Sequence, residues 1–528
     1  MTNTIADIEE ADVILVTGSN TTENHPVIST FVKRAVTRRG AKLVLIDPRR
    51  IKLADFSEKW LRPNLGTDVA WINGLIHVII KEDLYDKTFV EKRTEGFDDL
   101  KAMVERFTPE YVSEITGIPP RDIVEAARIY ATAKAAAILY CMGITQHISG
   151  TDNVKSLANL AMLCGNMGIR GGGVNPLRGQ NNVQGACDMG GLPNVFTGYQ
   201  KVTDPETVRK MEKAWSVSGL SDKPGLTVTE MVPMAHSGEI KALYIIGENP
   251  LVSDPDLNHA EASLKHLDFL VVQDIFLTET ARVADVVLPS CCFAEKEGTF
   301  SNTERRVQRV RKAVQQPGAA RQDWRITAGI ATRMGYPMQY ENAEAIFEEM
   351  AAVTPSYKGI TYGRIEKTGI HWPCPTADHP GTPVLHTETF PIGKGKFHAV
   401  EFIPPAERAD NEYPLYLTTG RVLYHYHTGT MTRKTEGLNE RSPESFVEIS
   451  TADAQKFELN DGDRVRIASR RGEITALLSV SDKAVDGTVF IPFHFAEAAA
   501  NRLTNAALDP VSKIPEYKVC AVKLSKAA

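Results

Sequence analysis

The sequence predicts an α/β protein that ends in a mostly β barrel. Three observations predict this fold class. Short apolar runs rich in β-branched residues alternate with helical stretches, several of these runs end in glycines, amides and acids, and the composition changes character from about Leu415 onward. At 528 residues the chain is too long for one core, so several domains are expected.

The first unit is predicted to be strand, turn, helix and strand. The apolar run over 13–16 breaks at Gly18, and a helical stretch follows over 27–39. A second strand over 42–46 then leads into Asp47. Strands joined in this way pair in parallel, and the ligands of such sheets lie beyond the carboxyl ends of the strands. The glycines do not form the GxGxxG pattern, so ordinary NAD binding is not predicted.

The same alternation continues along the chain. Helices are predicted over 68–81, 97–107, 119–132 and 153–164, and further strands over 136–140, 243–246 and 269–272. Five strand ends therefore carry glycines, amides and acids, which is more than one small ligand requires.

The C-terminal region is predicted to be a barrel of short strands. These strands cover 447–449, 464–467, 473–480 and 488–491, with turns such as Asn460–Asp463 between them. The segment over 355–389 is rich in Pro, Gly and His with weak periodicity, so surface loops are expected there.

Composition excludes several classes of function. The net charge of −6 provides no basic field for nucleic acid, and no apolar run is long enough to cross a membrane. The seven cysteines form no CxxC pair, so neither a disulfide framework nor a metal site is predicted from them, and they are typical of reduced thiols in a cytoplasmic protein. The first residues lack the pattern of a signal peptide.

One polar loop, Pro176–Gly190, stands out from the rest of the chain. It holds Arg178 followed by three carboxamides at 180–182, and three glycines, with almost nothing to bury. An arginine fork suits a carboxylate or phosphate, and amides pair with flat heterocycles. From composition alone, a polar loop with a salt-bridged arginine explains the segment equally well.

Taken together with the strand ends, the segment Arg178–Gly190 resembles the catalytic subunit of molybdenum- or tungsten-dependent formate dehydrogenases, in the molybdopterin oxidoreductase family typified by DMSO reductase. The likeness covers essentially the whole chain. Its motifs include Gly18–Pro26, Asp47–Arg49, Val271–Ile275, Ala284–Pro289, Glu297–Arg306 and Pro515–Lys518. The loop with Arg178 is the part that favours formate dehydrogenases over nitrate reductases.

The resemblance implies two molybdopterin guanine dinucleotides carrying Mo or W. Each would be held mainly by one of two Rossmann-like α/β domains, and a C-terminal double-psi-type β-barrel would touch both. The implied domains are a dinucleotide-binding domain over 1–180, a second over 181–295, a connecting region over 296–400 and the barrel over 401–528.

The resemblance also implies site residues. The first dinucleotide would be served by Gly18, Asn20, Glu23, Asp47 and Arg49, and the second by Gly247, Asn249, Gln273 and Asp274. Near the pterins the family positions are Met142, Gly143, Gln146, Gln180 and Asn181, and in the barrel they are Arg421, His425, Asn501, Tyr517 and Lys518. Taken singly, Gly18 and Asp47 are more often ordinary turn residues, and His425 is more often a packed barrel histidine.

The implied activity is oxidation of formate to carbon dioxide, with Arg178 as the anchor of the carboxylate. In the family, a metal-bound cysteine or selenocysteine, a histidine and a 4Fe–4S cluster precede the segment that corresponds to Met1, so no metal ligand is predicted in this chain. We therefore expect the chain to be the downstream part of a larger enzyme. Its translation start would have been assigned to the first Met after a UGA codon that encodes selenocysteine.

Formate and an electron-transfer subunit, such as an iron–sulfur protein, a diaphorase or a hydrogenase, are the expected partners, as in anaerobic respiration. Two alternatives stay open at this point. The chain could be a truncated, non-catalytic cofactor-binding protein, or another oxyanion reductase of the family, such as a nitrate reductase.

Overall fold

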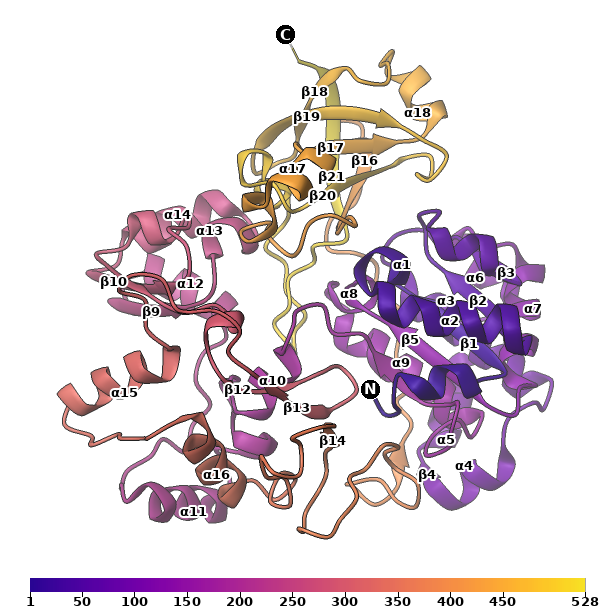
Figure 1. The fold of residues 1–528 in the computed structure, drawn as a ribbon. Helices are drawn as coiled ribbons and strands as arrows, with labels where there is room; N and C mark the ends of the chain where they lie inside the picture. Colours follow the sequence, from indigo (N-terminus) through magenta and orange to yellow (C-terminus); the bar gives the residue numbers. More distant parts are fainter. Residues whose placement is uncertain (528) are drawn as a thin grey trace. The chain divides into compact units, whose positions relative to one another are not determined.

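The computed structural model describes residues 1–527, which form two compact units (Figure 1). One unit comprises 1–179, 252–258 and the described residues from 384 to 527, and the other comprises 180–251 and 259–383. The first unit holds an α/β subdomain and a barrel, and the second holds three small sheets with their helices.

The α/β subdomain is built on a five-stranded parallel sheet in the order β3-β2-β1-β5-β6. Its strands are β1 (Val13–Thr17), β2 (Lys42–Ile46), β3 (Lys59–Leu61), β5 (Ala136–Tyr140) and β6 (Val174–Pro176). All five residues of β1 are buried. Val13 and Leu15 pack into one apolar cluster, and Ile14 packs into another, because successive side chains of a strand point to opposite faces.

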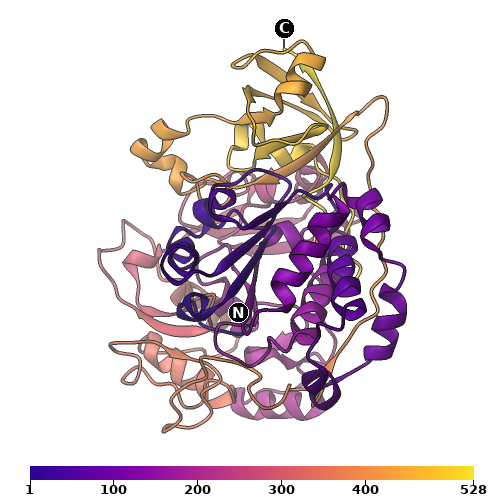
Figure 2. The same cartoon turned by 90° about the vertical axis from the view of Figure 1, so that its right-hand side faces the viewer.

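Helices cover both faces of this sheet (Figure 2). The helices of this subdomain are α1 (Thr21–Asn24), α2 (Pro26–Arg39), α3 (Asp68–Lys81), α4 (Lys87–Arg93), α5 (Phe97–Val104), α6 (Pro109–Thr116), α7 (Pro120–Ala131), α8 (Met142–Thr145) and α9 (Gly150–Leu163). Helix α2 starts at Pro26, whose fixed φ suits a first turn, and ends at Gly40 in the left-handed conformation. Helix α3 is apolar almost all round and lies in the larger cluster.

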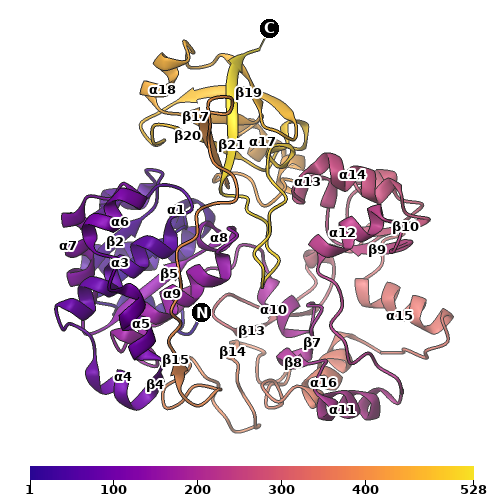
Figure 3. The same cartoon turned by 180° about the vertical axis from the view of Figure 1, so that it is seen from behind.

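The barrel closes in the order β16-β20-β17-β19-β18-β21. Its strands are β16 (Leu415–Gly420), β17 (Phe446–Ile449), β18 (Arg464–Ala468), β19 (Glu473–Val480), β20 (Thr488–Pro492) and β21 (Cys520–Lys526), with helices α17 (Glu436–Arg441) and α18 (Thr451–Lys456) between them. Strand β15 (Gly395–Lys396) pairs with β4 (Thr94–Glu95), and the chain then runs along the α/β subdomain to the barrel (Figure 3). The amides of Asn73 and Asn159 hold this segment through the carbonyls of Val400 and His398.

The second unit contains a three-stranded parallel sheet, β9 (Ala242–Ile246), β10 (Phe269–Asp274) and β11 (Val286–Pro289). Leu243 and Ile245 pack with Leu264 in an apolar cluster on one face. On the other face Tyr244, Ile246 and Phe269 are 39%, 48% and 46% exposed. Parallel sheets are normally covered on both faces, so this open apolar face is unusual.

The rest of the second unit is an antiparallel sheet with short helices. The sheet contains β12 (Gly298–Ser301), β13 (Arg306–Val310) and β14 (Ile370–His371), and β7 (Val195–Phe196) pairs with β8 (Gln200–Lys201). The helices are α10 (Val183–Asp188), α11 (Pro205–Trp215), α12 (Val228–His236), α15 (Asp323–Arg333) and α16 (Ala343–Val353), and α13 (Pro250–Ser253) and α14 (Leu257–Lys265) follow β9.

The fold class predicted from the sequence is confirmed. Strands 42–46, 136–140 and 473–480 form with the predicted bounds, and the segment over 355–389 contains only the short strand β14. Among the described residues, no helix is both long enough and apolar enough to cross a membrane. None of the seven cysteines, all of which lie among the described residues, forms a disulfide bond.

Candidate functional site

Two glycines bring the ends of β1 and β5 together. Gly18 follows β1 with φ +54°, and Gly143 lies in α8, directly beyond β5. The amide of Gly143 donates to the carbonyl of Gly18 at 3.0 Å. A Cβ at Gly18 would lie 2.7 Å from the carbonyl carbon of Gly143, so only glycine permits this approach.

The turn beyond Gly18 contains amides without protein partners. Both polar atoms of the Asn20 side chain are buried and make no hydrogen bond, and the same holds for Oδ1 of Asn24. Buried polar atoms are nearly always paired in folded proteins. An amide that offers one donor and one acceptor suits the paired edge of a heterocyclic base, so these residues fit the dinucleotide that the resemblance implies.

The residues at the end of β2 are charged and partly locked to the barrel. Burial raises the pKa of Asp47 to about 6, although the amide and the charge of Arg49 oppose this shift. The guanidinium of Arg49 donates to both carboxylate oxygens of Glu448 on β17, at 2.7 and 2.9 Å, and lies 4.0 Å from the ring centroid of Phe490. Arg49 thus ties the end of β2 to the barrel, and the charge of Glu23 in α1 contributes to the raised pKa of Arg49.

The pterin-side residues Met142, Gly143 and Gln146 lie in or next to α8. His147 follows them and is buried, with Nε2 at 2.8 Å from the carbonyl of Gly143. Burial lowers the pKa of His147 to about 4, so the ring is neutral near pH 7. Nε2 also lies 3.6 Å from the Asp68 carboxyl, whose pKa burial raises to about 7.

Arg178 lies just beyond β6, close to the ends of β1 and β5 in the same unit. Its positive charge opposes the effect of burial on Tyr140, the last residue of β5, whose pKa is raised to about 12. Arg421 of the barrel reaches the next residue, donating from Nη1 to the carbonyl of Gly179 at 2.9 Å. The loop thus carries one guanidinium group, that of Arg178, and a second one, that of Arg421, reaches it from the barrel. Two positively charged groups at one loop favour an anionic ligand.

The remaining barrel residues are held by backbone carbonyls. Asn501 and Tyr517 both donate to the carbonyl of Ser253, at 2.7 and 3.0 Å. Lys518 donates to the carbonyl of Thr419 at 2.6 Å, and burial lowers its pKa to about 8. His425 has both nitrogens next to oxygens of its own region, the Ser442 carbonyl and the Thr432 hydroxyl.

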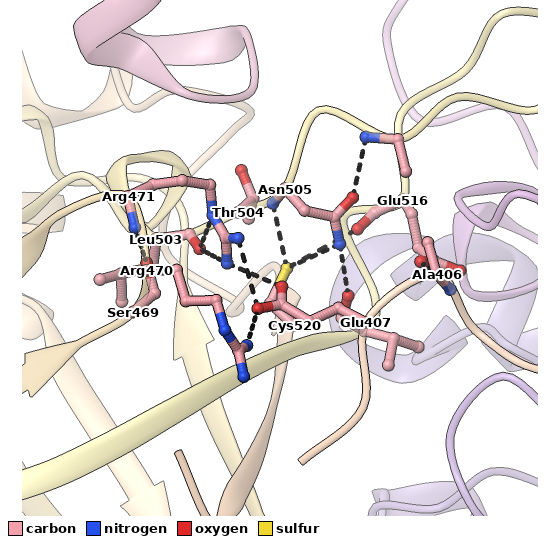
Figure 4. A network of polar contacts seen from close by, with 12 residues as sticks. Ala406, Glu407, Ser469, Arg470, Arg471, Leu503, Thr504, Asn505, Glu516 and Cys520 are labelled. Atoms are coloured by element: carbon pink, nitrogen blue, oxygen red, sulfur yellow. Dashed lines mark hydrogen bonds and ion pairs between the residues drawn. The ribbon is translucent and has the colours of Figure 1, made fainter. Parts of the chain in front are cut away.

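A polar network fixes the segment that carries Tyr517 and Lys518 (Figure 4). Asn505 donates its backbone amide to the thiol of Cys520 at 3.3 Å, and Arg471 donates to Glu407 at 2.8 Å. Glu516, which precedes β21, accepts the amides of Ala406 at 3.1 Å and Ile148 at 3.4 Å, so it joins the segment before β16 to the loop before α9. Burial raises the pKa of Glu516 to about 7.

In the second unit, the predicted residues lie at the ends of β9 and β10. Gly247 has φ +64°, and a Cβ added there would have no heavy atom within 4 Å. Asn249 donates to Glu279 at 2.8 Å and accepts the hydroxyl of Thr280 at 2.7 Å. Gln273 contacts Tyr244 and donates to Asp323 at 2.8 Å.

Asp274 completes this group, and burial raises the pKa of its carboxyl. Gln180 and Asn181 belong to the same unit and begin the loop that leads into α10.

The sequence argument missed the residue that anchors this loop. Asp188 ends α10 and is fully buried. Its carboxylate accepts hydrogen bonds from Gln184 at 2.7 Å, Tyr199 at 2.9 Å and Trp372 at 2.8 Å. Tyr357 makes a further contact. No local pattern predicts this role, because two of the partners, Tyr357 and Trp372, lie more than 160 residues away in sequence.

The predicted residues divide between the two units. The first unit contains Gly18, Asn20, Glu23, Asp47, Arg49, Met142, Gly143, Gln146, Arg178, Arg421, His425, Asn501, Tyr517 and Lys518. The second contains Gln180, Asn181, Gly247, Asn249, Gln273 and Asp274. Over residues 1–527, no three His, Cys, Asp or Glu side chains are grouped so that they could hold a metal ion.

Two family models match the chain. The molybdopterin oxidoreductase model matches residues 1–333, and the molybdopterin dinucleotide binding domain model matches residues 415–521. The second match coincides with the barrel strands β16 to β21.

Relatives of known name are similar over the whole chain. The F420-dependent formate dehydrogenase subunit alpha of Methanocaldococcus jannaschii is 54% identical over 100% of this chain and 78% of its own length. Formate dehydrogenase H of Escherichia coli is 42% identical over 100% of this chain and 74% of its own. Among solved structures, acetylene hydratase from Pelobacter acetylenicus has a TM-score of 0.79 at 20% identity, covering 99% of this chain and 81% of that one, which shows a shared fold.

The arrangement at the strand ends, the family models and these relatives agree. The chain belongs to the molybdopterin oxidoreductase family and groups there with the formate dehydrogenase alpha subunits.

Proposed function

We propose that the chain is the catalytic subunit of a formate dehydrogenase, which oxidises formate to carbon dioxide. The observation that carries this proposal is the 54% identity to a formate dehydrogenase alpha subunit over the whole chain. The similarity includes residues 334–414, which neither family model matches.

Arg178 is the residue we assign to the substrate. Formate is a small anion whose carboxylate has two oxygens, and a guanidinium offers two parallel N–H donors to such a group. Anchoring the carboxylate leaves the C–H bond as the part of formate free to meet the oxidant. The nearby guanidinium of Arg421 adds positive charge around the same loop.

We further propose that the cofactor is a pair of molybdopterin guanine dinucleotides carrying Mo or W. When bound, the metal centre supplies the two-electron oxidant for formate. In the first unit, the unpaired amide of Asn20, the glycine contact at Gly18 and the buried Asp47 support one dinucleotide. Lys518 and Arg421 would add positive charge toward its phosphates.

In the second unit, the turn at Gly247 and Asn249 and the strand end at Gln273 and Asp274 support the other dinucleotide. The domain division at 180, 295 and 400 belongs to the same proposal. Each part then contains a main sheet or the barrel, and among residues 1–527 only the short strand β15 of the connecting region pairs with a strand of another part, β4.

The enzyme's partners follow from its chemistry. Formate oxidation releases two electrons, so we propose an electron-transfer subunit as partner and a 4Fe–4S cluster as the first acceptor, as the family resemblance implies. The relatives are named as alpha subunits, which supports further subunits in the complex. Seven cysteines without a disulfide among the described residues favour a reducing compartment, so we place the enzyme in the cytoplasm.

The test is replacement of Arg178 by Lys in the cofactor-loaded enzyme. A single ammonium cannot make the paired contact, and losing one hydrogen bond to a charged group costs about 1.5–3 kcal/mol, so kcat/KM for formate should fall about 10- to 100-fold. Formate-dependent reduction of an artificial dye gives the kinetics, and metal analysis with chromatography of the released nucleotide identifies Mo or W and guanine.

Arg121→Lys is the matched control. Arg121 is 82% exposed on α7 and pairs with Glu125 one turn along, so its replacement should leave the kinetics unchanged. Loaded wild-type enzyme that reduces no dye with formate would overturn the proposed activity, whereas normal kinetics in Arg178→Lys would overturn only the assignment of the anchor.

A further inference from the structure

Three consecutive carbonyl groups around Arg178 are each held by a side chain from a different element. The thiol of Cys141 donates to the carbonyl of Leu177 at 3.0 Å. Nε2 of His25 lies 2.8 Å from the carbonyl oxygen of Arg178. Arg421 donates to the carbonyl of Gly179 at 2.9 Å. Such a series on one short loop is not explained by secondary structure, because these residues follow β6 and lie in no helix or strand.

We infer that His25 is a positioning residue for Arg178, holding the backbone of the arginine so that its guanidinium is fixed in place. The inference rests on the proposed role of Arg178 and extends it to a residue that acts only through the arginine. Cys141 and Arg421 hold the two flanking carbonyls, so the three side chains act as one clamp.

The backbone of His25 is itself rigid. His25 lies between α1 and α2, where its amide donates to the carbonyl of Thr21 at 3.0 Å and its own carbonyl accepts the amide of Ser29 at 2.9 Å. Pro26 follows directly and starts α2. The ring is therefore presented from a helix junction that is bonded on both sides, which gives it little freedom to follow a moving loop.

The His25 ring is neutral and donates a hydrogen bond through Nε2. A carbonyl oxygen only accepts, so Nε2 must carry the proton of this hydrogen bond. Nδ1 is buried and has no protein partner. Burial and the charge of Arg421 lower the pKa of His25, which keeps the ring neutral. A protonated ring would place a second N–H donor at a buried position where the protein offers no acceptor.

The other side of the loop is held by close packing. A Cβ at Gly179 would lie 2.7 Å from Nη2 of Arg421, so the guanidinium packs directly against the glycine. The amide of Leu177 donates to the carbonyl of Tyr140 at 2.8 Å, which extends the pairing of β5 and β6 by one residue. Arg178 thus lies between two residues, Leu177 and Gly179, whose backbones are held. The hydrogen bond from His25 holds the carbonyl group of Arg178 itself.

The test compares His25→Ala and His25→Gln in the cofactor-loaded enzyme. A misplacement of about 1 Å can cost about 100-fold in rate, so His25→Ala should lower kcat/KM for formate about 10- to 100-fold with cofactor content unchanged. His25→Gln retains an N–H donor of similar reach and should recover kcat/KM to within a few-fold of wild type. Hydrogen–deuterium exchange of the peptide covering 174–183 should be faster in His25→Ala and near normal in His25→Gln.

His77→Ala is the matched control. His77 is also buried, its Nδ1 lies 2.9 Å from the carbonyl of Val104, and its Nε2 has no partner, yet it lies in α3 beside α5. Its replacement should lower stability without changing formate kinetics or exchange at 174–183.

Unchanged exchange in His25→Ala overturns the clamp, and faster exchange with unchanged kinetics overturns its role in positioning. The exchange experiment needs no formate. It therefore tests the clamp even if the wild-type enzyme fails to oxidise formate, which would overturn the proposed function instead.

Discussion

Two turns of similar sequence end the first strands of the two parallel sheets, and they differ in how their polar groups are used. Gly18 and Asn20 follow β1, and Gly247 and Asn249 follow β9, with both glycines at positive φ. The Asn20 amide is buried without a partner, whereas Asn249 bonds Glu279 and Thr280. Without its dinucleotide, the first turn therefore keeps an unsatisfied amide at a cost in stability, whereas the amide of the second turn already has partners in the protein.

The supports of the two turns differ as well. The sheet of the first unit has helices on both faces and is tied to the barrel by Arg49 and Glu448. The three-stranded sheet of the second unit leaves one apolar face open. Close packing should therefore make Gly18 costlier to replace than Gly247, whereas the unpaired amide of Asn20 should be cheaper to remove than the bonded amide of Asn249.

The largest expected effect is loss of the tie between β2 and the barrel. Glu448 is 3% exposed, and its removal leaves the largely buried charge of Arg49 without its carboxylate. Breaking a buried pair in this way costs about 3–5 kcal/mol, so Glu448→Ala should lower the unfolding free energy by that amount. Urea unfolding measures it, and Lys87→Ala, which removes an exposed pair with Asp83, is the control and should change little. A small loss in Glu448→Ala would mean that the barrel is held by other contacts.

Alanine at the two glycines should give unequal losses. A left-handed residue other than glycine costs roughly 1–2 kcal/mol, which applies to both positions. Gly18→Ala should lose a further amount of roughly 1–3 kcal/mol, because its Cβ would overlap the backbone of Gly143, whereas Gly247→Ala meets open space. Thermal unfolding of the two variants gives the difference, and equal losses would contradict the close contact between Gly18 and Gly143.

The buried carboxyl of Asp68 should make stability depend on pH. Its pKa is raised to about 7 in the folded protein, against about 3.9 in an unfolded chain. The folded state therefore holds this proton more tightly. The contribution of the protonated carboxyl to stability is fully present below about pH 4 and is lost as the pH rises through 7.

Relative to wild type, Asp68→Asn should gain stability from pH 4 to pH 8, by roughly 2–4 kcal/mol. Urea unfolding at several pH values measures this gain. The matched change Asp274→Asn should gain less, because two backbone amides stabilise the Asp274 carboxylate. A difference between Asp68→Asn and wild type that does not vary with pH would contradict the burial of Asp68.

The smallest effects should have opposite signs at the two asparagines. In the cofactor-free protein, Asn20→Ala removes an unpaired buried amide and should be neutral or stabilising by about 1 kcal/mol. Asn249→Ala leaves Thr280 and Glu279 without their partner and should cost about 1–3 kcal/mol. Thermal unfolding distinguishes them, and the cofactor retained on purification should fall in Asn20→Ala. A clear loss of stability in both variants would remove the contrast between the turns.

Much of the fold could be predicted because its strands are short apolar runs. The strands at 42–46 and 136–140 are buried on both faces, and such runs need no long-range information to be recognised. The polar strand β12 and the three-residue strands β3 and β6 could not be predicted, because their pairing depends on neighbours rather than on their own pattern.

The candidate site was predictable mainly through the family resemblance. Residue chemistry alone indicated the strand ends and the Arg178 loop. It could not indicate His25, which looks like an ordinary residue before a helix proline, or Asp188, whose partners are distant in sequence. These residues act through backbone or buried contacts, and only the folded chain brings their partners to them.

The open face of the sheet formed by β9, β10 and β11 has a consequence for anyone who produces this protein. Tyr244, Ile246 and Phe269 form a flat apolar area on parallel strands, the kind of surface that chaperones bind and that drives aggregation. We expect the isolated chain to bind fluorescent apolar dyes in its native state and to give a better yield at low temperature with added chaperones. The substitution Tyr244→Glu should reduce both the fluorescence of the bound dye and the amount of protein lost when the sample is concentrated.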